Sequence, residues 1–169
     1  MTRAPNAVVV RDATAEDWPA IWAFLRDIVE SGETFTWDRT TDEATARSKW
    51  LHHPPGVTLV AVDEVGTVLG TAEIHPNYEG GGRHVANAGF MVDPRHGGRG
   101  VGRTLGEQVI DRARRDGYEA MVFNAVVETN VNAVTLWRSL GFDVLATIPR
   151  AFAHPTQGKV GLLVMHRHL

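Results

Sequence analysis

The sequence predicts a mixed β-sheet flanked by helices, a fold of the α/β (α+β) class. Strand-like and helix-like segments follow in the order β-α-α-β-β-β-α-β-α-β-β, which contains neither regular βαβ repeats nor the spacing of an all-β protein. The chain has 169 residues, of which 43% are hydrophobic and 22% charged, as in globular proteins with one core. We therefore expect a single domain over residues 1–169.

Composition and charge exclude several classes of protein. No apolar run approaches the roughly 18 residues that span a bilayer, and the first residues lack the apolar stretch of a signal peptide. A formal net charge of −3 gives no reason to expect nucleic acid or a membrane as a partner. The absence of cysteine excludes disulfides, thiolate metal ligands and a cysteine nucleophile. The expectation is a soluble cytoplasmic domain.

Local signals place the elements of the first half. Residues 7–11 form a short apolar strand. A capping-box pattern at residues 14–17 starts a helix whose apolar positions recur at helical spacing until Gly32. A second helix begins at residues 40–43 and ends before two consecutive prolines. The next elements are a hairpin of two strands, 57–62 and 68–74.

The second half continues with alternating strands and helices. A turn-rich stretch, 76–82, precedes them. Gly117 and Gly141 supply the ends of the two helices. The expected elements are a strand over 84–92, a helix over 102–115, a strand over 120–127, a helix over 130–140, and strands over 143–150 and 160–168.

Residues 92–105 carry a strand end, a glycine cluster and a helix start. Four glycines fall within six residues, and glycine lets a ligand approach the main-chain N–H groups closely. The helix start adds unpaired N–H groups and the positive end of the helix dipole. The loop is therefore predicted to bind an anion, and Arg99 and Arg103 add positive charge. A loose turn is the alternative.

Two phosphate-binding motifs fit this loop poorly. Residues 97–104 nearly match G-x-x-x-x-G-K-[ST], but Arg103 occupies the position of the lysine. The dinucleotide pattern G-x-G-x-x-G, started at Gly98, has Arg103 where the third glycine belongs. A P-loop nucleotide binder is thus kept only as an alternative.

The loop resembles the acetyl-coenzyme A (acetyl-CoA) site of the GNAT family of N-acetyltransferases, whose pattern Arg/Gln-x-x-Gly-x-Gly/Ala follows a strand. Gly100 and Gly102 match both glycines, and Gly97 replaces the Arg or Gln. Residues 130–142 resemble a second family signature, N-x-x-A-x-x-L-Y-x-x-x-G-F, with Trp137 at the tyrosine position. The resemblance covers essentially the whole chain.

The resemblance implies the GNAT acyl-CoA N-acyltransferase fold, in which two central strands, 84–92 and 120–127, splay apart at one end and are flanked by helices. The pantetheine arm of acetyl-CoA would lie in that gap. By this resemblance the residues that bind the co-substrate are Met91, Val92, Gly97, Gly98, Arg99, Gly100, Val101, Gly102, Arg103, Asn130, Ala133 and Trp137.

The activity implied is transfer of the acetyl group of acetyl-CoA to the amine of a small molecule, by direct attack through a tetrahedral intermediate. The Val92 N–H would be the oxyanion donor. The family's usual general acid is the tyrosine that Trp137 replaces, and an indole N–H cannot give up a proton at neutral pH. Water or another side chain would protonate the departing thiolate, or no acid is needed, because a thiol pKa is about 8.5.

Two asparagines are the implied catalytic side chains beside Val92. Residues 76–77, 84–90 and 123–130 resemble the subgroup that contains fungal azetidine-2-carboxylate (proline-analogue) N-acetyltransferases. By this resemblance Asn124 orients the acceptor or a catalytic water, and Asn130 contacts the pantetheine or the tetrahedral centre. The alternatives are a structural role for Asn124, as a buried amide that must find partners, and helix capping for Asn130.

The acceptor side is expected where residues 33–37 join the first two helices. The residues expected to bind the acceptor are Glu33, Phe35, Trp37, Asn87 and Asn124. Alternatively, Phe35 and Trp37 only seal the edge of the core. Candidates for a general base are Glu73, His75 and His84, because they lie near the strands that border the site.

No metal site is expected. His52 and His53 are adjacent and would point apart, and His166 with His168 lacks further ligands at a recognisable spacing.

The expected acceptor is an amino acid or amino-acid analogue, and the expected role is detoxification. Alternatives are a phosphinothricin-type antibiotic or herbicide acetyltransferase and a catalytically silent acyl-CoA sensor. A homodimer is kept as a candidate assembly.

Overall fold

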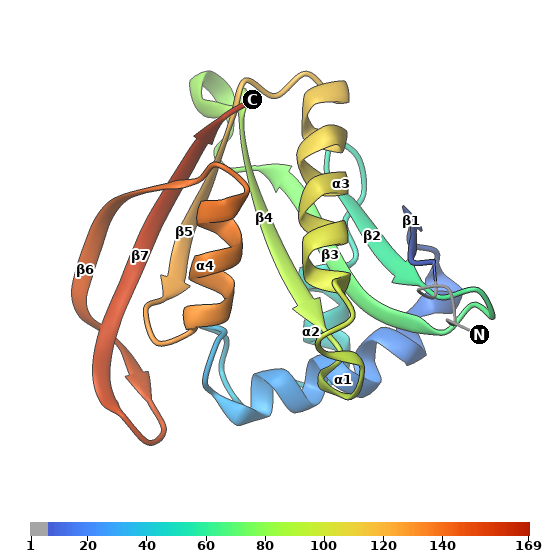
Figure 1. Ribbon diagram of the computed structural model, residues 1–169, viewed down its shortest axis with the longest axis horizontal. Helices are drawn as coiled ribbons and strands as arrows, with labels where there is room; N and C mark the ends of the chain where they lie inside the picture. The colour runs from blue at the N-terminus through green and yellow to red at the C-terminus, as the bar shows by residue number, and fades with distance from the viewer. Residues whose placement is uncertain (1–6) are drawn as a thin grey trace, which may run out of the picture.

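A computed structural model describes residues 7–169 and contains one seven-stranded sheet with helices on both faces (Figure 1). The strands are β1 (Val9–Asp12), β2 (Val57–Val62), β3 (Val68–Pro76), β4 (Val85–Val92), β5 (Ala120–Val127), β6 (Asp143–His154) and β7 (Gly158–His168). The α-helices are α1 (Trp18–Ser31), α2 (Glu43–Trp50), α3 (Val101–Arg115) and α4 (Val131–Ser139). Short 3₁₀ turns lie at η1 (Ala15–Asp17), η2 (Gly80–Gly82) and η3 (Pro94–His96).

The sheet is mixed, with the strand order β1-β2-β3-β4-β5-β7-β6. Neighbouring strands run antiparallel except β4 and β5, which are parallel. These two strands pair only at Val85↔Ala120 and Ala86↔Met121, and then diverge (Figure 1). The expected splay of the two central strands is therefore confirmed.

The helices bury two apolar layers, one on each face of the sheet. Leu105 and Val109 of α3 and Trp137 of α4 belong to the larger layer, which includes Phe123 of β5. Alternate side chains of a strand point to opposite faces, so the same sheet supplies a second layer beneath α1 and α2. Trp50 of α2 lies in that layer and is almost fully buried.

The expected elements all form, with shifts at their ends that have local causes. The first helix begins with η1, where the Thr14 N–H donates to the Asp17 carboxylate at 2.8 Å, and it ends at Gly32, whose φ is 68°. The final hairpin is longer than expected. Pairing continues on both sides of a bulge between Ile148 and Phe152, where Arg150 has a φ of 55°.

Within residues 7–169, no helix is long and apolar enough to cross a membrane.

Gly70 on β3 sets how closely α3 approaches the sheet. A Cβ at this position would lie 3.0 Å from the Met91 carbonyl oxygen and 3.1 Å from side-chain atoms of Leu105 and Val101. We expect Gly70→Val to destabilise the fold by about 1–3 kcal/mol, because its methyl groups meet main chain and helix at once. Urea unfolding measures this cost. Val65→Ala, at an 86% exposed residue, is the control, and equal stabilities would contradict the prediction.

Candidate functional site

A cavity of about 320 Å³ occupies the gap between the diverging strands β4 and β5. The segment between α1 and α2 closes it from one side, and α4 closes it from another. The residues that line it are Thr34, Phe35, Thr36, Trp37, Glu73, Asn87, Ala88, Gly89, Phe90, Phe123, Asn124, Ala125, Val126, Val127, Asn130, Ala133 and Trp137. We call this cavity the gap pocket.

Most residues expected on the acceptor side line the gap pocket. Phe35 and Trp37 pack edge-on against Trp50, each with ring centroids 6.0 Å from it, so they also seal the core edge. The two proposed roles are thus compatible. Glu33 does not line the pocket: it follows the helix end at Gly32, and its side chain is exposed.

Asn124 is exposed, contrary to the expectation of a buried amide. The register between β5 and β7 shifts between Phe123 and Val126, so Asn124 lies in a bulge that re-aims its side chain. Its amide faces that of Asn77, which follows β3. The Asn124 Nδ2 donates to Asn77 Oδ1 at 2.7 Å, and the reverse contact measures 3.5 Å. Asn77 was not among the expected site residues, because nothing in the sequence pairs positions 47 residues apart.

Two other amides have their oxygen atoms committed to the main chain. Asn130 Oδ1 caps α4 by accepting the Ala133 N–H at 3.4 Å, and Asn87 Oδ1 accepts the Ala88 N–H at 2.8 Å. Asn130 therefore caps α4 as the alternative expected, and the N–H groups of its side-chain amide stay available to donate elsewhere. Both residues line the gap pocket, so it gains two hydrogen-bond donors.

Trp137 is 7% exposed and belongs to an aromatic cluster at the back of the pocket. Its ring centroid lies 4.5 Å from that of Phe90 on β4 and 5.0 Å from that of Phe123 on β5. The indole thus fills the space between the two diverging strands. A packing role is the one its contacts support.

The main chain of β4 faces the gap at Val92 but not at Met91. The Asp93 N–H donates to the Leu69 carbonyl at 2.9 Å, and Val92 pairs with Gly70 without a register shift. Main-chain groups alternate sides along a strand, so those of Val92 point away from β3, whereas those of Met91 point toward it. Met91 instead buries its side chain in the layer under α1 and α2.

The glycine loop leads from β4 into α3. Gly98 and Gly100 have φ values of 74° and 76°, in the left-handed region that favours glycine, whereas Gly97 has a φ of −60°. The loop residues 97–100 are exposed, and the first N–H groups of α3, from Val101 on, have no partner within the helix. These features fit an anion such as a diphosphate.

The arginines of this segment differ in their contacts. The Arg103 guanidinium donates to Ser139 Oγ on α4 at 2.7 Å and lies 3.8 Å from Glu107. Arg99 lies on the exposed loop, with its guanidinium 3.4 Å from the His96 ring. Arg99 is therefore the more available of the two for a ligand.

Asp93 fixes the turn between β4 and the loop. It is 1% exposed, accepts the Arg95 N–H at 3.0 Å and pairs with the Arg95 guanidinium at 2.6 Å. These hydrogen bonds, despite burial, hold the pKa of Asp93 below its usual range. Apart from the Asp93-Pro94 pair, no sequence pattern indicates this role.

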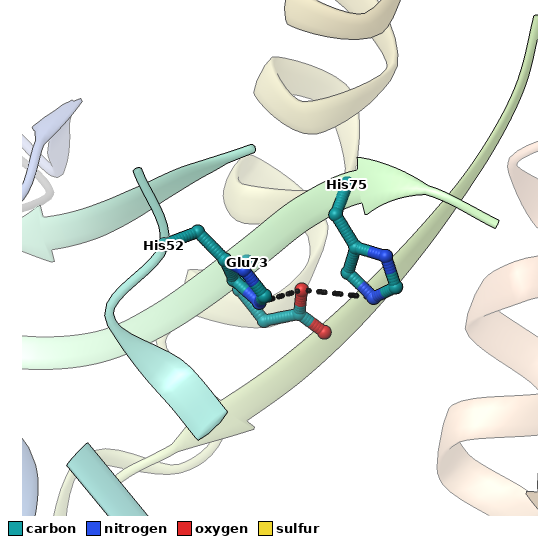
Figure 2. A group of neighbouring side chains, drawn as sticks. All are labelled: His52, Glu73 and His75. Atoms are coloured by element: carbon teal, nitrogen blue, oxygen red, sulfur yellow. Dashed lines mark ion pairs between the residues drawn. The ribbon is translucent and has the colours of Figure 1, made fainter. Parts of the chain in front are cut away.

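Glu73 is the one ionisable side chain among the described residues that line the gap pocket. It lies on β3 with two imidazoles beside it: His75, two residues further along the strand, and His52, which follows α2 (Figure 2). Of the expected general-base candidates, Glu73 is therefore in the pocket and His75 next to it. His84 is exposed, near the paired beginning of β4 and β5, and does not line the pocket.

The model of the acetyltransferase (GNAT) family matches residues 22–142, which is more than half of the chain. The chain belongs to this family. A solved structure described as a GCN5-related N-acetyltransferase from Kribbella flavida is 55% identical, with a TM-score of 0.94, over 96% of this chain and 98% of that one. A second structure, yncA from Salmonella typhimurium with its cofactor acetyl-CoA, is 29% identical, with a TM-score of 0.82, over 96% and 94%.

Two curated relatives match a smaller share of this chain than the two structures do. The N-acetyltransferase aca1 of Schizosaccharomyces pombe is 38% identical over 52% of this chain, which spans 42% of that protein. An L-methionine sulfoximine/L-methionine sulfone acetyltransferase of Pseudomonas aeruginosa is 32% identical over 83% of each chain.

Family membership makes this GNAT protein an acyltransferase that uses acetyl-CoA as co-substrate. The GNAT fold expected from the sequence is confirmed, and the P-loop nucleotide binder is set aside. Association into a homodimer and a cytoplasmic location stay predictions.

We expect Asp93→Asn to lower stability by about 1–3 kcal/mol at pH 7, because a buried carboxylate loses its charge-assisted hydrogen bonds to the exposed Arg95 guanidinium. The pKa of Asp93 is depressed in the folded state, so its stabilisation is complete above the usual pKa of about 3.9 and disappears as pH falls through the lower folded value. The stability difference between wild type and variant should therefore shrink in acid.

Urea unfolding at neutral and acid pH measures this difference. Asp27→Asn, which removes the carboxylate of an exposed pair with Arg26, is the control. A difference that does not change with pH would contradict the assignment.

Proposed function

We propose that this GNAT enzyme acetylates the amino group of a small amino acid or amino-acid analogue. The observation that carries the proposal is the polarity of the gap pocket. Glu73 offers a carboxylate to the acceptor's amine, while Asn87 and Asn130 offer amide N–H donors to the acceptor's carboxylate. A cavity of about 320 Å³ lies at the lower end of the range for small-molecule sites.

The resemblance to the azetidine-2-carboxylate subgroup and the relative named for methionine sulfoximine both support an acceptor of this kind. They differ in the amine, since azetidine-2-carboxylate carries a secondary ring amine and methionine sulfoximine a primary one. The pocket polarity fits both, because each acceptor places a carboxylate next to its amine.

When bound, acetyl-CoA supplies an activated acetyl thioester for attack by the acceptor amine. The main-chain N–H groups of the exposed glycine loop and of the start of α3 would hold the diphosphate, with Arg99 adding charge. The Val92 N–H, which is free of the ladder to β3, would donate to the oxygen that gains charge as the amine adds.

Glu73 is proposed to receive the proton that the acceptor ammonium must lose before attack. Asn124, held by Asn77, would orient the acceptor or a water molecule. Trp137 supplies no proton, so the thiolate would leave unprotonated or take a proton from water.

We expect Asn124→Ala to lower acetyl transfer at least tenfold and to change acetyl-CoA affinity little. The residue is exposed and lies in a bulge, so its removal should leave the fold intact. Asn77→Ala should act in the same direction, because it frees the Asn124 amide. Steady-state kinetics and calorimetry measure the two quantities.

The control is Asn132→Ala, on the exposed side of α4, which should leave turnover unchanged. Unaltered turnover in Asn124→Ala would remove Asn124 from the mechanism.

An acceptor panel tests the proposed function directly. We expect azetidine-2-carboxylate, methionine sulfoximine or phosphinothricin to give a kcat/KM at least tenfold above that of the matching amine without a carboxylate. Release of the CoA thiol, followed with a thiol reagent, measures turnover. A preference for phosphinothricin would favour the phosphinothricin-type alternative.

Preference for amines without a carboxylate would overturn the acceptor class. Binding of acetyl-CoA with no turnover of any amine would favour the silent acyl-CoA sensor.

A further inference from the structure

His52, Glu73 and His75 form a compact group at the edge of the gap pocket, which we call the imidazole–carboxylate cluster (Figure 2). His52 Nε2 lies 3.0 Å and His75 Nε2 lies 3.5 Å from the same oxygen, Glu73 Oε2. The three ligand atoms all lie within 4.8 Å of one another. The side chains are partly to largely buried, with 25%, 11% and 31% exposed for His52, Glu73 and His75.

Each member of the cluster is held in place by its surroundings. The main-chain N–H of His52 donates to Thr58 Oγ1 at 3.0 Å, and a Cβ at Gly56 would lie 2.9 Å from the His52 Cβ. Glu73 pairs across the ladder with Gly89, where a Cβ would lie 2.7 Å from Glu73 Oε1. The two glycines thus leave room for these side chains.

The hydrogen bonding of His75 decides which ring nitrogen faces Glu73 with a lone pair. Nδ1 lies 2.8 Å from the Pro76 carbonyl, and a carbonyl can only accept, so Nδ1 carries the hydrogen. In the neutral ring, Nε2 then turns its lone pair toward Glu73 Oε2. Metal-binding histidines commonly make such a bond from the nitrogen that does not bind the metal.

Glu73 Oε2 is buried and has no hydrogen-bond partner within residues 7–169, although two ring nitrogens lie close to it. The two contacts are ion pairs only when a ring is protonated. A buried carboxylate oxygen without a partner is costly, and a cation shared with the two rings would remove that cost.

We propose that the imidazole–carboxylate cluster binds one divalent transition-metal ion, with Zn²⁺ as the probe. Two histidines and one glutamate form a known ligand set for zinc with an open fourth position. Bond lengths of about 2.1 Å in a tetrahedral site place the ligand atoms about 3.4 Å apart. The two separations from Glu73 Oε2, 3.0 and 3.5 Å, bracket that value.

The spacing of the histidines did not predict this site. His52 was paired in sequence with His53, whereas in the structure its partners are Glu73 and His75 of β3.

The metal is not required for acetyl transfer. Its binding would withdraw Glu73 from the gap pocket and so inhibit the enzyme reversibly, a consequence that rests on the proposed function. Binding itself is independent of that function, because it needs no acceptor.

Metal binding is tested on the untagged protein without substrates. Competition with a chromogenic chelator should give one Zn²⁺ per chain, and Co²⁺ should produce visible absorption bands on binding. His52→Ala, His75→Ala and Glu73→Gln should each weaken Zn²⁺ binding at least tenfold, because each removes a ligand. Glu73→Gln keeps the shape of the side chain, so a folding defect does not obscure the result.

The matched control is His53→Ala, at an exposed histidine next to His52, which should bind Zn²⁺ like the wild type. Wild-type protein without a stoichiometric site, or variants that bind as well as wild type, would overturn the proposal.

The link to catalysis has a separate readout. Zn²⁺ should lower the turnover of the wild type, and a chelator should restore it. The Zn²⁺ concentration that halves turnover should be at least tenfold higher for His75→Ala than for the wild type. Equal sensitivity in both proteins would overturn the link. If no amine were turned over at all, the proposed function would fail while the binding experiment still decided the metal site.

Discussion

The site depends on the divergence of β4 and β5 after two paired residues. β4 remains paired with β3 along seven residues, from Ala86 to Val92, while β5 follows β7 and bulges after Phe123. The strands therefore turn away from each other because each is held by its outer neighbour. Their separation leaves main-chain groups of β4 without a partner strand, and such groups need one. A ligand that adds a pseudo-strand in the gap would meet that need, and the same gap holds the gap pocket.

Trp137 shows how one substitution changes both packing and chemistry. A tyrosine at this position could donate a proton, whereas the indole fills the gap with a larger apolar surface between Phe90 and Phe123. The aromatic cluster thus helps to keep the strands apart. Under the proposed function, acid–base chemistry would fall to Glu73, the ionisable side chain among the described residues that line the gap pocket.

The sequence predicted what depends on local pattern and missed what depends on contact between distant segments. Capping signals and periodicity placed the helices, and two motifs predicted the splayed strands. The bulge that exposes Asn124 had no such signal, because it arises from pairing between β5 and β7. Asn77 likewise meets Asn124 only through the sheet, whereas Glu73, an expected general-base candidate, does line the pocket. Glu33 lies in the segment 33–37 expected to border the acceptor, but its side chain is exposed and does not line the pocket.

Glu73 connects the gap pocket to the imidazole–carboxylate cluster, because its two oxygens face different surroundings. Oε1 lies over Gly89, which lines the cavity, whereas Oε2 faces His52 and His75. Any side chain at residue 89 would push the carboxylate from this position, so glycine there serves both arrangements. A proton or a metal ion held at Oε2 must change the charge available at Oε1, since the carboxylate shares one negative charge over both atoms. Under the proposed function, the fold would therefore couple the state of the two imidazoles to the binding of the acceptor amine.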